Sequence, residues 1–337
     1  MHADVVHPRE LGAEQAARWR ALQQRSPLLG SPFLGPSFAQ VVGAERPDAR
    51  VAVLSDGAGF FGFHRSRGRI GAPLGRTLAD YQGVVAEPDL AWTPEQLVHA
   101  CGLRSYAFDH VITAQRQWQP AIRARDPSPV VDLTRFDPEK DMPRESRQKA
   151  RRLARDGEPR FVWHEPDPAA LATLVGWKRR QYARSGVHDI FAHPWVPGLV
   201  SRLHGAAEPD LAGVLACLYD GEDLIAAQLA LVAGPVMHLW MPAYDPARAD
   251  QSPGLVLQRE ILLGAPAHGV TIVDFGKGTD GYKGRFANDT IEVGAGSVQS
   301  AAPWRAVAAS ARAVVQAANR TRLQGPVYRA ERRAQVG

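Results

Sequence analysis

The clearest pattern of apolar and polar positions lies between residues 236 and 275, where a strand, a helix and a second strand follow one another. Residues 236–243 are apolar and aromatic enough for a buried strand. A helix is predicted over residues 253–265, because apolar side chains recur at helical spacing and Ser252 stands at the N-cap position. Gly269 suits a left-handed C-terminal cap, and the β-branched residues 270–275 predict a second strand parallel to the first.

The same reading of the remaining chain predicts alternating helices and strands. Helices are expected at 14–25, 37–42, 94–101, 144–155, 168–185 and 303–323. Strands are expected at 50–54, 60–63, 106–112, 130–133, 160–164, 211–218, 224–232 and 290–293. No repeat is visible by residue identity, but both halves share an order of helix, hairpin and later strands, as tandem copies of one fold would.

The chain is long enough for two domains, since 337 residues with 45% hydrophobic content can bury two ordinary cores. Prolines and charges crowd together between residues 119 and 143, which predicts a connection there. We therefore expect an N-terminal lobe, a connector, a C-terminal lobe, and an amphipathic helix with a basic tail, at residues 1–125, 126–143, 144–300 and 301–337.

Composition predicts a soluble cytoplasmic protein. Two cysteines, Cys101 and Cys217, lie in apolar settings typical of buried reduced thiols. The N-terminus has no apolar signal core, and no segment reaches the ~18 apolar residues that a membrane span requires.

The net charge of +5 is unevenly distributed. Residues 144–160 contribute +4 and residues 303–337 contribute +6, which leaves −5 for the rest of the chain. Two basic segments of this kind are either solvated helix faces or contacts for an acidic partner, and they do not indicate a DNA-coating protein.

Several kinds of chemistry lack their usual residues. His188 and His193 are five residues apart, off a common helix face, so even with Asp189 between them no metal site is expected. The glycines of residues 276–281 lack the GxGxxG spacing of a dinucleotide site, and there is no GxSxG nucleophile motif. Among the kinds of chemistry considered, the one that remains is a reaction without a covalent enzyme intermediate.

Four short motifs occur in order in the C-terminal half: PAYDP at 242–246, SPG at 252–254, DFG at 274–276 and YK at 282–283. Together they resemble the GNAT acyltransferase superfamily, in the branch that contains the cellulose-biosynthesis (CelD/BcsL) acetyltransferases and is similar to FemAB-type transferases. WKRRQY at 177–182 and the hairpin at 214–232 extend the resemblance over roughly residues 144–298. SPFLGPSF at 31–38 and DYQG at 80–83 match the first part of this branch more weakly.

The resemblance implies an α/β (α+β) protein of two tandem GNAT-like lobes, each a mixed twisted sheet flanked by helices. It also implies an N- or O-acyltransferase that moves an acyl group from a thioester to an amine or hydroxyl of a small polar or sugar-like acceptor by direct attack. The donor would lie along the backbone of Met241, Pro242 and Ala243. Its phosphates would meet the helix start at Ser252, Gly254 and Leu255, and Arg248 could add charge.

Several residues are candidates for the transfer step. Asp245, Asp274, Tyr282 and His238 stand at strand ends or in loops, and the sequence does not rank them as general bases. Asp245 would equally suit a turn, and Asp274 would equally suit a structural hydrogen bond. Lys283 matches the lysine of the family's YK pair, which implies electrostatic stabilisation or binding of a substrate carboxylate.

The acceptor is expected beside the helix at 168–185. Trp177, Lys178, Gln181 and Tyr182 offer flat apolar surfaces and donors on consecutive turns, although the two aromatic residues would equally suit the core. Tyr81 and Gln82, in an exposed-looking loop of the first lobe, would close the other side of the site, although a turn whose Tyr81 packs on the core is equally compatible with the sequence.

The sequence does not determine the identity of the acyl donor. ADQSPG at 249–254 replaces the glycine-rich pyrophosphate loop of ordinary acetyl-CoA enzymes. Acyl-CoA, acyl carrier protein and, as in FemAB relatives, aminoacyl-tRNA are all compatible with the basic segments. A non-catalytic RNA- or ligand-binding module is the alternative of a different class.

Overall fold

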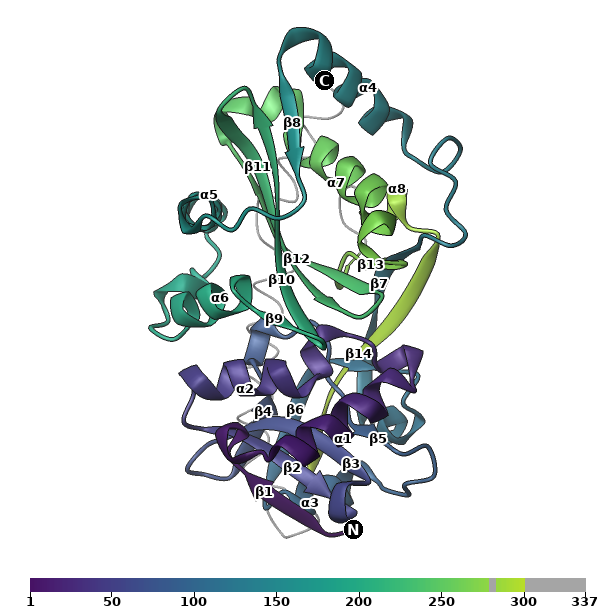
Figure 1. Cartoon of the computed structure of the whole chain (residues 1–337). Helices are drawn as coiled ribbons and strands as arrows, with labels where there is room; N and C mark the ends of the chain where they lie inside the picture. Colours follow the sequence, from purple (N-terminus) through teal and green to yellow (C-terminus); the bar gives the residue numbers. More distant parts are fainter. Residues whose placement is uncertain (279–282, 301–337) are drawn as a thin grey trace.

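The computed structural model describes residues 1–278 and 283–300, which form one mixed 14-stranded sheet flanked by helices (Figure 1). The first lobe contains β1 Ala3–Val6, β2 Ala49–Leu54, β3 Gly59–Arg65, β4 Ile70–Pro73, β5 Val85–Ala86 and β6 Ser105–Ile112, with α1 Ala13–Gln24, α2 Pro36–Glu45 and α3 Pro94–Ala100. The second lobe contains β8 Pro159–Val162, β9 Ala207–Glu208, β10 Leu211–Asp220, β11 Asp223–Ala233, β12 Val236–Tyr244 and β13 Ile272–Asp274. Its helices are α4 Arg144–Asp156, α5 Pro168–Ser185, α6 Val196–His204, α7 Pro253–Gly264 and α8 Lys283–Phe286.

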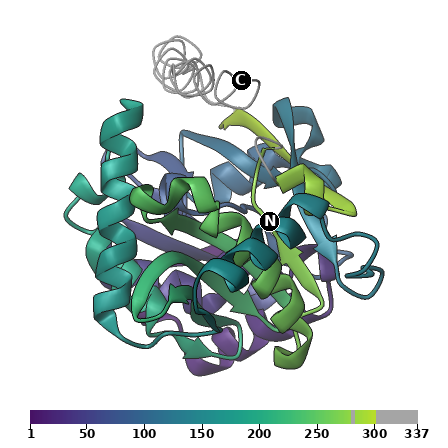
Figure 2. The same ribbon diagram turned by 90° about the horizontal axis from the view of Figure 1, so that it is seen from above.

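Two strands join the lobes, β7 Ile122–Asp132 and β14 Asp289–Gln299. The strand order runs β1-β2-β3-β4-β6-β14-β7-β13-β12-β11-β10-β8, so β14 pairs with β6 of the first lobe and with β7, and β7 pairs with β13 of the second. Figure 1 shows the yellow β14 running from the upper, green lobe into the lower, purple and blue one. Viewed from above, the second lobe lies over the first (Figure 2).

This architecture confirms the expected mixed sheets with flanking helices. Nearly all neighbouring strands are antiparallel, and the parallel pairs are β12 with β13 and β4 with β6. Within the described part of the chain, no helix combines the length and apolarity that crossing a bilayer needs. The helix expected at 303–323 lies outside the described residues.

The strand, helix and strand predicted between residues 236 and 275 are confirmed as β12, α7 and β13. Two details at the ends of α7 differ from the prediction. Ser252 is left-handed, with φ 52°, and its side chain makes no capping bond. The helix ends at Gly264 and a 3-10 turn, Ala265–His268, follows, so the left-handed Gly269 caps that turn and not α7.

β7 is longer than the predicted 130–133, although it includes Pro127 and Pro129. In an antiparallel ladder the N–H and C=O of one residue point to the same side. Here the Pro127 and Pro129 carbonyls accept from the N–H groups of Gly278 and Phe275, at 2.8 and 3.0 Å. The chain on that side of β7 presents N–H groups, which need carbonyl acceptors, so the missing proline N–H groups cost no hydrogen bond. The two bonds hold the segment after β13 against β7.

One hydrophobic core runs through both lobes. It packs α1 and α2 of the first lobe with α5 and α6 of the second, and includes Phe38, Leu174, Leu199 and Leu229. A second core lies under α7, and a third lies under α3 of the first lobe.

A buried carboxylate also joins the lobes. Asp210, just before β10, accepts bonds from the backbone N–H and the hydroxyl of Ser37 at 2.9 and 2.8 Å, and from Arg20 at 2.5 Å. Gly35 is needed beside it, since a Cβ there would lie 2.5 Å from the Asp210 carboxylate.

We predict that Asp210→Ala lowers the free energy of unfolding by roughly 3 kcal/mol, because Arg20 and the Ser37 N–H then lose a buried charged partner. Urea denaturation of the purified variant measures this. Asp223→Ala is the matched control, since that side chain is 75% exposed and its partner Arg248 keeps Asp220. Equal losses in both variants would contradict the assignment.

Candidate functional site

β12 and β13 separate soon after they meet. They pair only where Val236, Met237 and His238 lie beside Ile272, Val273 and Asp274. Beyond His238, β12 continues to Tyr244, paired with β11 on one side and with no described strand on the other. An open edge of this kind offers backbone donors and acceptors to an extended ligand.

The open edge leads to the start of α7. Met241 and Ala243 are buried while Pro242 and Tyr244 are exposed, as the alternation of a strand requires. A Cβ on Gly254 would lie 3.5 Å from the Tyr244 ring, so the first turn of α7 faces the end of β12. The N–H groups of this first turn and its positive dipole end suit an anion.

Arg248 holds the loop between β12 and α7 in place. Its guanidinium pairs with Asp220 at 3.0 Å and with Asp223 at 3.2 Å. Asp245 accepts from the N–H of Ala247 at 3.0 Å and caps the 3-10 turn Pro246–Gln251. The predicted general base Asp245 therefore lies at the opposite end of β12 from His238.

A buried polar network lies where β12 and β13 separate. Asp274 accepts from the Tyr81 hydroxyl at 2.5 Å, the Ser128 hydroxyl at 3.1 Å and the Gly276 N–H at 2.7 Å. His238 lies between two carboxylates, with Nε2 2.9 Å from Asp80 and Nδ1 3.6 Å from Asp274.

The network joins the lobes, because Asp80 and Tyr81 come from the first and His238 and Asp274 from the second. Gly276 is required at this point. Its φ is 72°, and a Cβ there would lie 3.3 Å from Asp80 and 3.4 Å from His238.

Charge and burial oppose each other in this network. Burial alone would lower the pKa of His238, but the charge of Asp274 and the hydrogen bond with Asp80 raise it to about 9. Burial would raise the pKa of Asp274, and the charge of His238 with the Tyr81 and Gly276 hydrogen bonds lowers it instead. Burial and the adjacent Asp274 carboxylate raise the pKa of Tyr81. A His238 cation between carboxylates is therefore the stable form at neutral pH.

The structure corrects the expectation of an exposed loop at residues 80–83 and agrees with the alternative, in which Tyr81 packs in the core. Tyr81 and Gln82 are 2% and 4% exposed. Gln82 donates to Asp109 at 2.7 Å and accepts from the backbone N–H of Asp109 and His110, so it is used within the first lobe. The second lobe covers Asp80 and Tyr81 through His238 and Asp274, whereas Gln82 is held by the first lobe.

Two lysines lie close together beside this junction. Lys178 of α5 donates to Gln181 at 3.1 Å and lies 5.3 Å from the Tyr182 ring centre. Burial, with the charge of Lys283 nearby, lowers the pKa of Lys178 to about 8. Lys283 donates to the carbonyl of Lys277 at 3.2 Å. Trp177 is 6% exposed and belongs to the core shared by the lobes.

The structure thus brings together His238, Asp274 and Tyr81, and separately Lys178 and Lys283. Tyr282 lies outside the described residues. Asp80 and Ser128 belong to the network but were not among the predicted residues. Asp80 adjoins the predicted Tyr81, whereas Ser128 stands in a proline-rich segment that gave no signal.

His188 and His193 lie on the surface with their Nε2 atoms 3.0 Å apart. Among the described residues, no third histidine, cysteine or carboxylate joins them to form a group that could hold a metal ion.

Residues 140–284 match the model of the acetyltransferase (GNAT) domain family, so this part of the chain is a GNAT-type acyltransferase domain. No curated protein matches the chain.

Three solved structures share the fold of nearly the whole chain. One is the C-terminal domain of a putative lysylphosphatidylglycerol synthetase from Agrobacterium fabrum, with 17% identity, a TM-score of 0.58, and 90% of this chain and 95% of that chain covered. FemX has 13% identity and a TM-score of 0.54, with 88% of this chain and 96% of that chain covered. L-PGS from Bacillus licheniformis has 12% identity and a TM-score of 0.52, with 89% of this chain and 95% of that chain covered. The fold of most of this chain is therefore shared with these three structures.

The His238 network predicts a pH-dependent stability. A pKa raised from 6.5 to about 9 stabilises the fold fully below pH 6.5, and this contribution is lost as the pH rises towards 9. We expect a loss of up to about 3 kcal/mol across this window, measured by urea denaturation at several pH values. His238→Gln should remove the slope, and His2→Gln, whose side chain is 71% exposed, should keep it. An unchanged slope in His238→Gln would contradict the prediction.

Proposed function

We propose that the protein moves an acyl group from a thioester, either acyl-CoA or an acyl carrier protein, to an amine or hydroxyl of a small polar acceptor. The observation that carries this proposal is the open edge of β12, which runs from the start of α7 to the place where β12 and β13 part. A donor arm of amides would pair with the backbone of Met241, Pro242 and Ala243.

The donor's phosphate end would lie at the first turn of α7. This turn offers the backbone N–H of Gly254, since that of Leu255 already donates to the carbonyl of Ser252 at 3.0 Å, and the left-handed Ser252 sets the direction in which the helix begins. Arg248 supports this loop through its pairs with Asp220 and Asp223, so we assign it a positioning role.

The two lysines suit the transfer step. Direct attack of the acceptor on the thioester carbonyl forms a C–N or C–O bond, places negative charge on the carbonyl oxygen, and then releases the thiolate. Lys283 offers a compact positive charge for that oxygen. Lys178, with a pKa near 8, has a free amine in part of the molecules at neutral pH and would accept the proton of the attacking group.

His238 and Asp274 would act from beneath the site. They are 0% and 2% exposed, which leaves little of either for an acceptor to contact. We assign them, with Asp80 and Tyr81, the task of fixing the junction of β12 and β13. The acceptor would then lie over α5, near Lys178, Gln181 and Tyr182.

Aminoacyl transfer from tRNA is the second candidate. The fold similarity to FemX and to a lysylphosphatidylglycerol synthetase domain favours it, whereas the residue motifs favour the cellulose-biosynthesis branch. A non-catalytic RNA-binding module is the third candidate.

Three assays separate these candidates. Release of free thiol from a panel of acyl-CoAs, or from acyl carrier proteins, supports thioester transfer. Turnover only with charged tRNA supports the second candidate. Tight, steeply salt-dependent RNA binding without turnover of any donor would reject the enzymatic proposal.

We predict that Lys283→Met lowers kcat by about 100-fold while the KM for the donor changes little, because its charge acts mainly in the transition state. Steady-state thiol release measures both constants. Lys140→Met, at a side chain that is 81% exposed, is the matched control and should retain full activity. A Lys283→Met variant that folds and keeps the original kcat would refute the role.

Lys178 is predicted to shape the pH profile. In the original protein kcat should rise as the pH passes through about 8, since the free amine is then populated. Lys178→Gln should remove this rise, whereas Gln181→Ala should keep it and raise the KM of the acceptor. Retention of the rise in Lys178→Gln would move the base elsewhere.

A further inference from the structure

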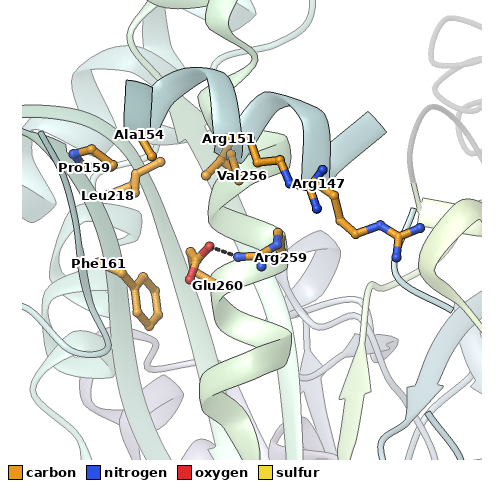
Figure 3. Close-up of a pocket in the computed structure, with 10 residues that line it drawn as sticks. Arg147, Arg151, Ala154, Pro159, Phe161, Leu218, Val256, Arg259 and Glu260 are labelled. Carbon is orange, nitrogen blue, oxygen red and sulfur yellow. Dashed lines mark hydrogen bonds and ion pairs between the residues drawn. The ribbon is translucent and has the colours of Figure 1, made fainter. Parts of the chain in front are cut away.

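A pocket of about 370 Å³ lies between α4 and α7, over β8 and β10 (Figure 3). None of the residues assigned to the transfer step lines it. Its floor is apolar and includes Phe161 of β8, Leu218 of β10 and Val256 of α7. Ala150, Ala154 and Pro159 complete the apolar lining.

Three arginines and a single carboxylate provide the charge of the pocket. Arg147 and Arg151 stand one turn apart on α4, a spacing that places both on the same face, and Arg259 comes from α7. Glu260 pairs with Arg259, so the lining keeps two positive charges in excess.

The arginines retain unused hydrogen-bonding capacity. Arg259 has a buried Nε without a partner among the described residues. No acidic side chain in the described part of the chain pairs with Arg151, whereas its neighbour Arg152 lies 3.6 Å from Asp156. Arg147 donates one bond to the carbonyl of Glu139 at 2.5 Å and keeps its other donors. A planar guanidinium with free N–H groups binds phosphate strongly.

The volume of the pocket limits the size of the ligand. Small-molecule sites measure roughly 300–1,000 Å³, so this pocket lies near the small end of that range. An inorganic phosphate would leave the apolar floor bare, while a complete coenzyme A would exceed the space. Phe161 provides a flat apolar surface for a ring or a short alkyl group.

The position of the pocket separates it from the donor edge of β12. It opens on the side of α7 that faces α4 and β8, and α4 is held there by a bond from Lys149 to the carbonyl of Asp250 at 3.0 Å. The pocket is therefore built on a fixed helix pair and not on a surface loop.

We propose that this pocket is a second ligand site, which takes an organic phosphate: one phosphate group carried on a small planar or apolar body. The phosphate lies between Arg151 and Arg259, and the body lies against Phe161 and Leu218. A soluble nucleotide and a phospholipid head group share this chemistry.

Calorimetric titration of the full chain tests the proposal with three probes: AMP, inorganic phosphate, and vesicles of phosphatidylcholine with or without phosphatidylglycerol. We expect AMP or the anionic vesicles to bind, and whichever binds identifies the source. Arg151→Gln should weaken that binding by roughly tenfold. Arg152→Gln is the matched control, with the same charge change on the same helix outside the pocket.

Each other outcome overturns the proposal. Equal weakening of ligand binding in Arg152→Gln would show that the effect comes from the overall charge of α4 and not from the pocket. Inorganic phosphate binding as tightly as AMP would remove the role of the apolar floor. An absence of binding by AMP and by anionic vesicles would reject the site. Arg151 and Arg152 are both exposed, so these variants keep the fold, and thiol release remains a separate readout of the proposed transfer.

Discussion

The cation of His238, enclosed between Asp80 and Asp274, is the interaction on which the arrangement of the two lobes depends. A buried charge is costly unless it is paired, and here each of its two neighbours comes from a different lobe. The same pairing fixes the point at which β12 and β13 part, since His238 and Asp274 are the last residues of their parallel register. One electrostatic contact thus holds the lobe interface and the opening of the donor edge together.

Much of the fold could be predicted from the sequence because the local signals agree with the final packing. The helix of residues 168–185 shows this best: Asp167 caps its start by accepting from Ala169, and the left-handed Gly186 ends it. β7 could not be predicted in full, because prolines within a segment argue against a strand. Only the structure shows that the neighbouring segment needs carbonyl acceptors and no N–H donors at these positions. The long pairing of β14 with both lobes was equally hidden, since register between distant strands leaves no local pattern.

The site was predictable in its parts but not in its assembly. Residue types and family motifs selected His238, Asp274 and Tyr81, which the fold brings into one network. They did not reveal that the network is buried, because the residues that cover Asp80 and Tyr81 come from a lobe more than a hundred residues away. Asp245 illustrates the opposite case, as a carboxylate at a strand end that serves to cap a turn.

The placement of β14 has a consequence for how the protein forms during synthesis. β6 has its partner β4 early, but its other edge stays unpaired until residues 289–299 have left the ribosome. The first lobe therefore waits for almost the entire described chain before its sheet is continuous with the rest, and the edge of β6 is open to foreign strands meanwhile. A protein of this connectivity completes its first lobe last, and truncation before residue 289 leaves that edge permanently exposed.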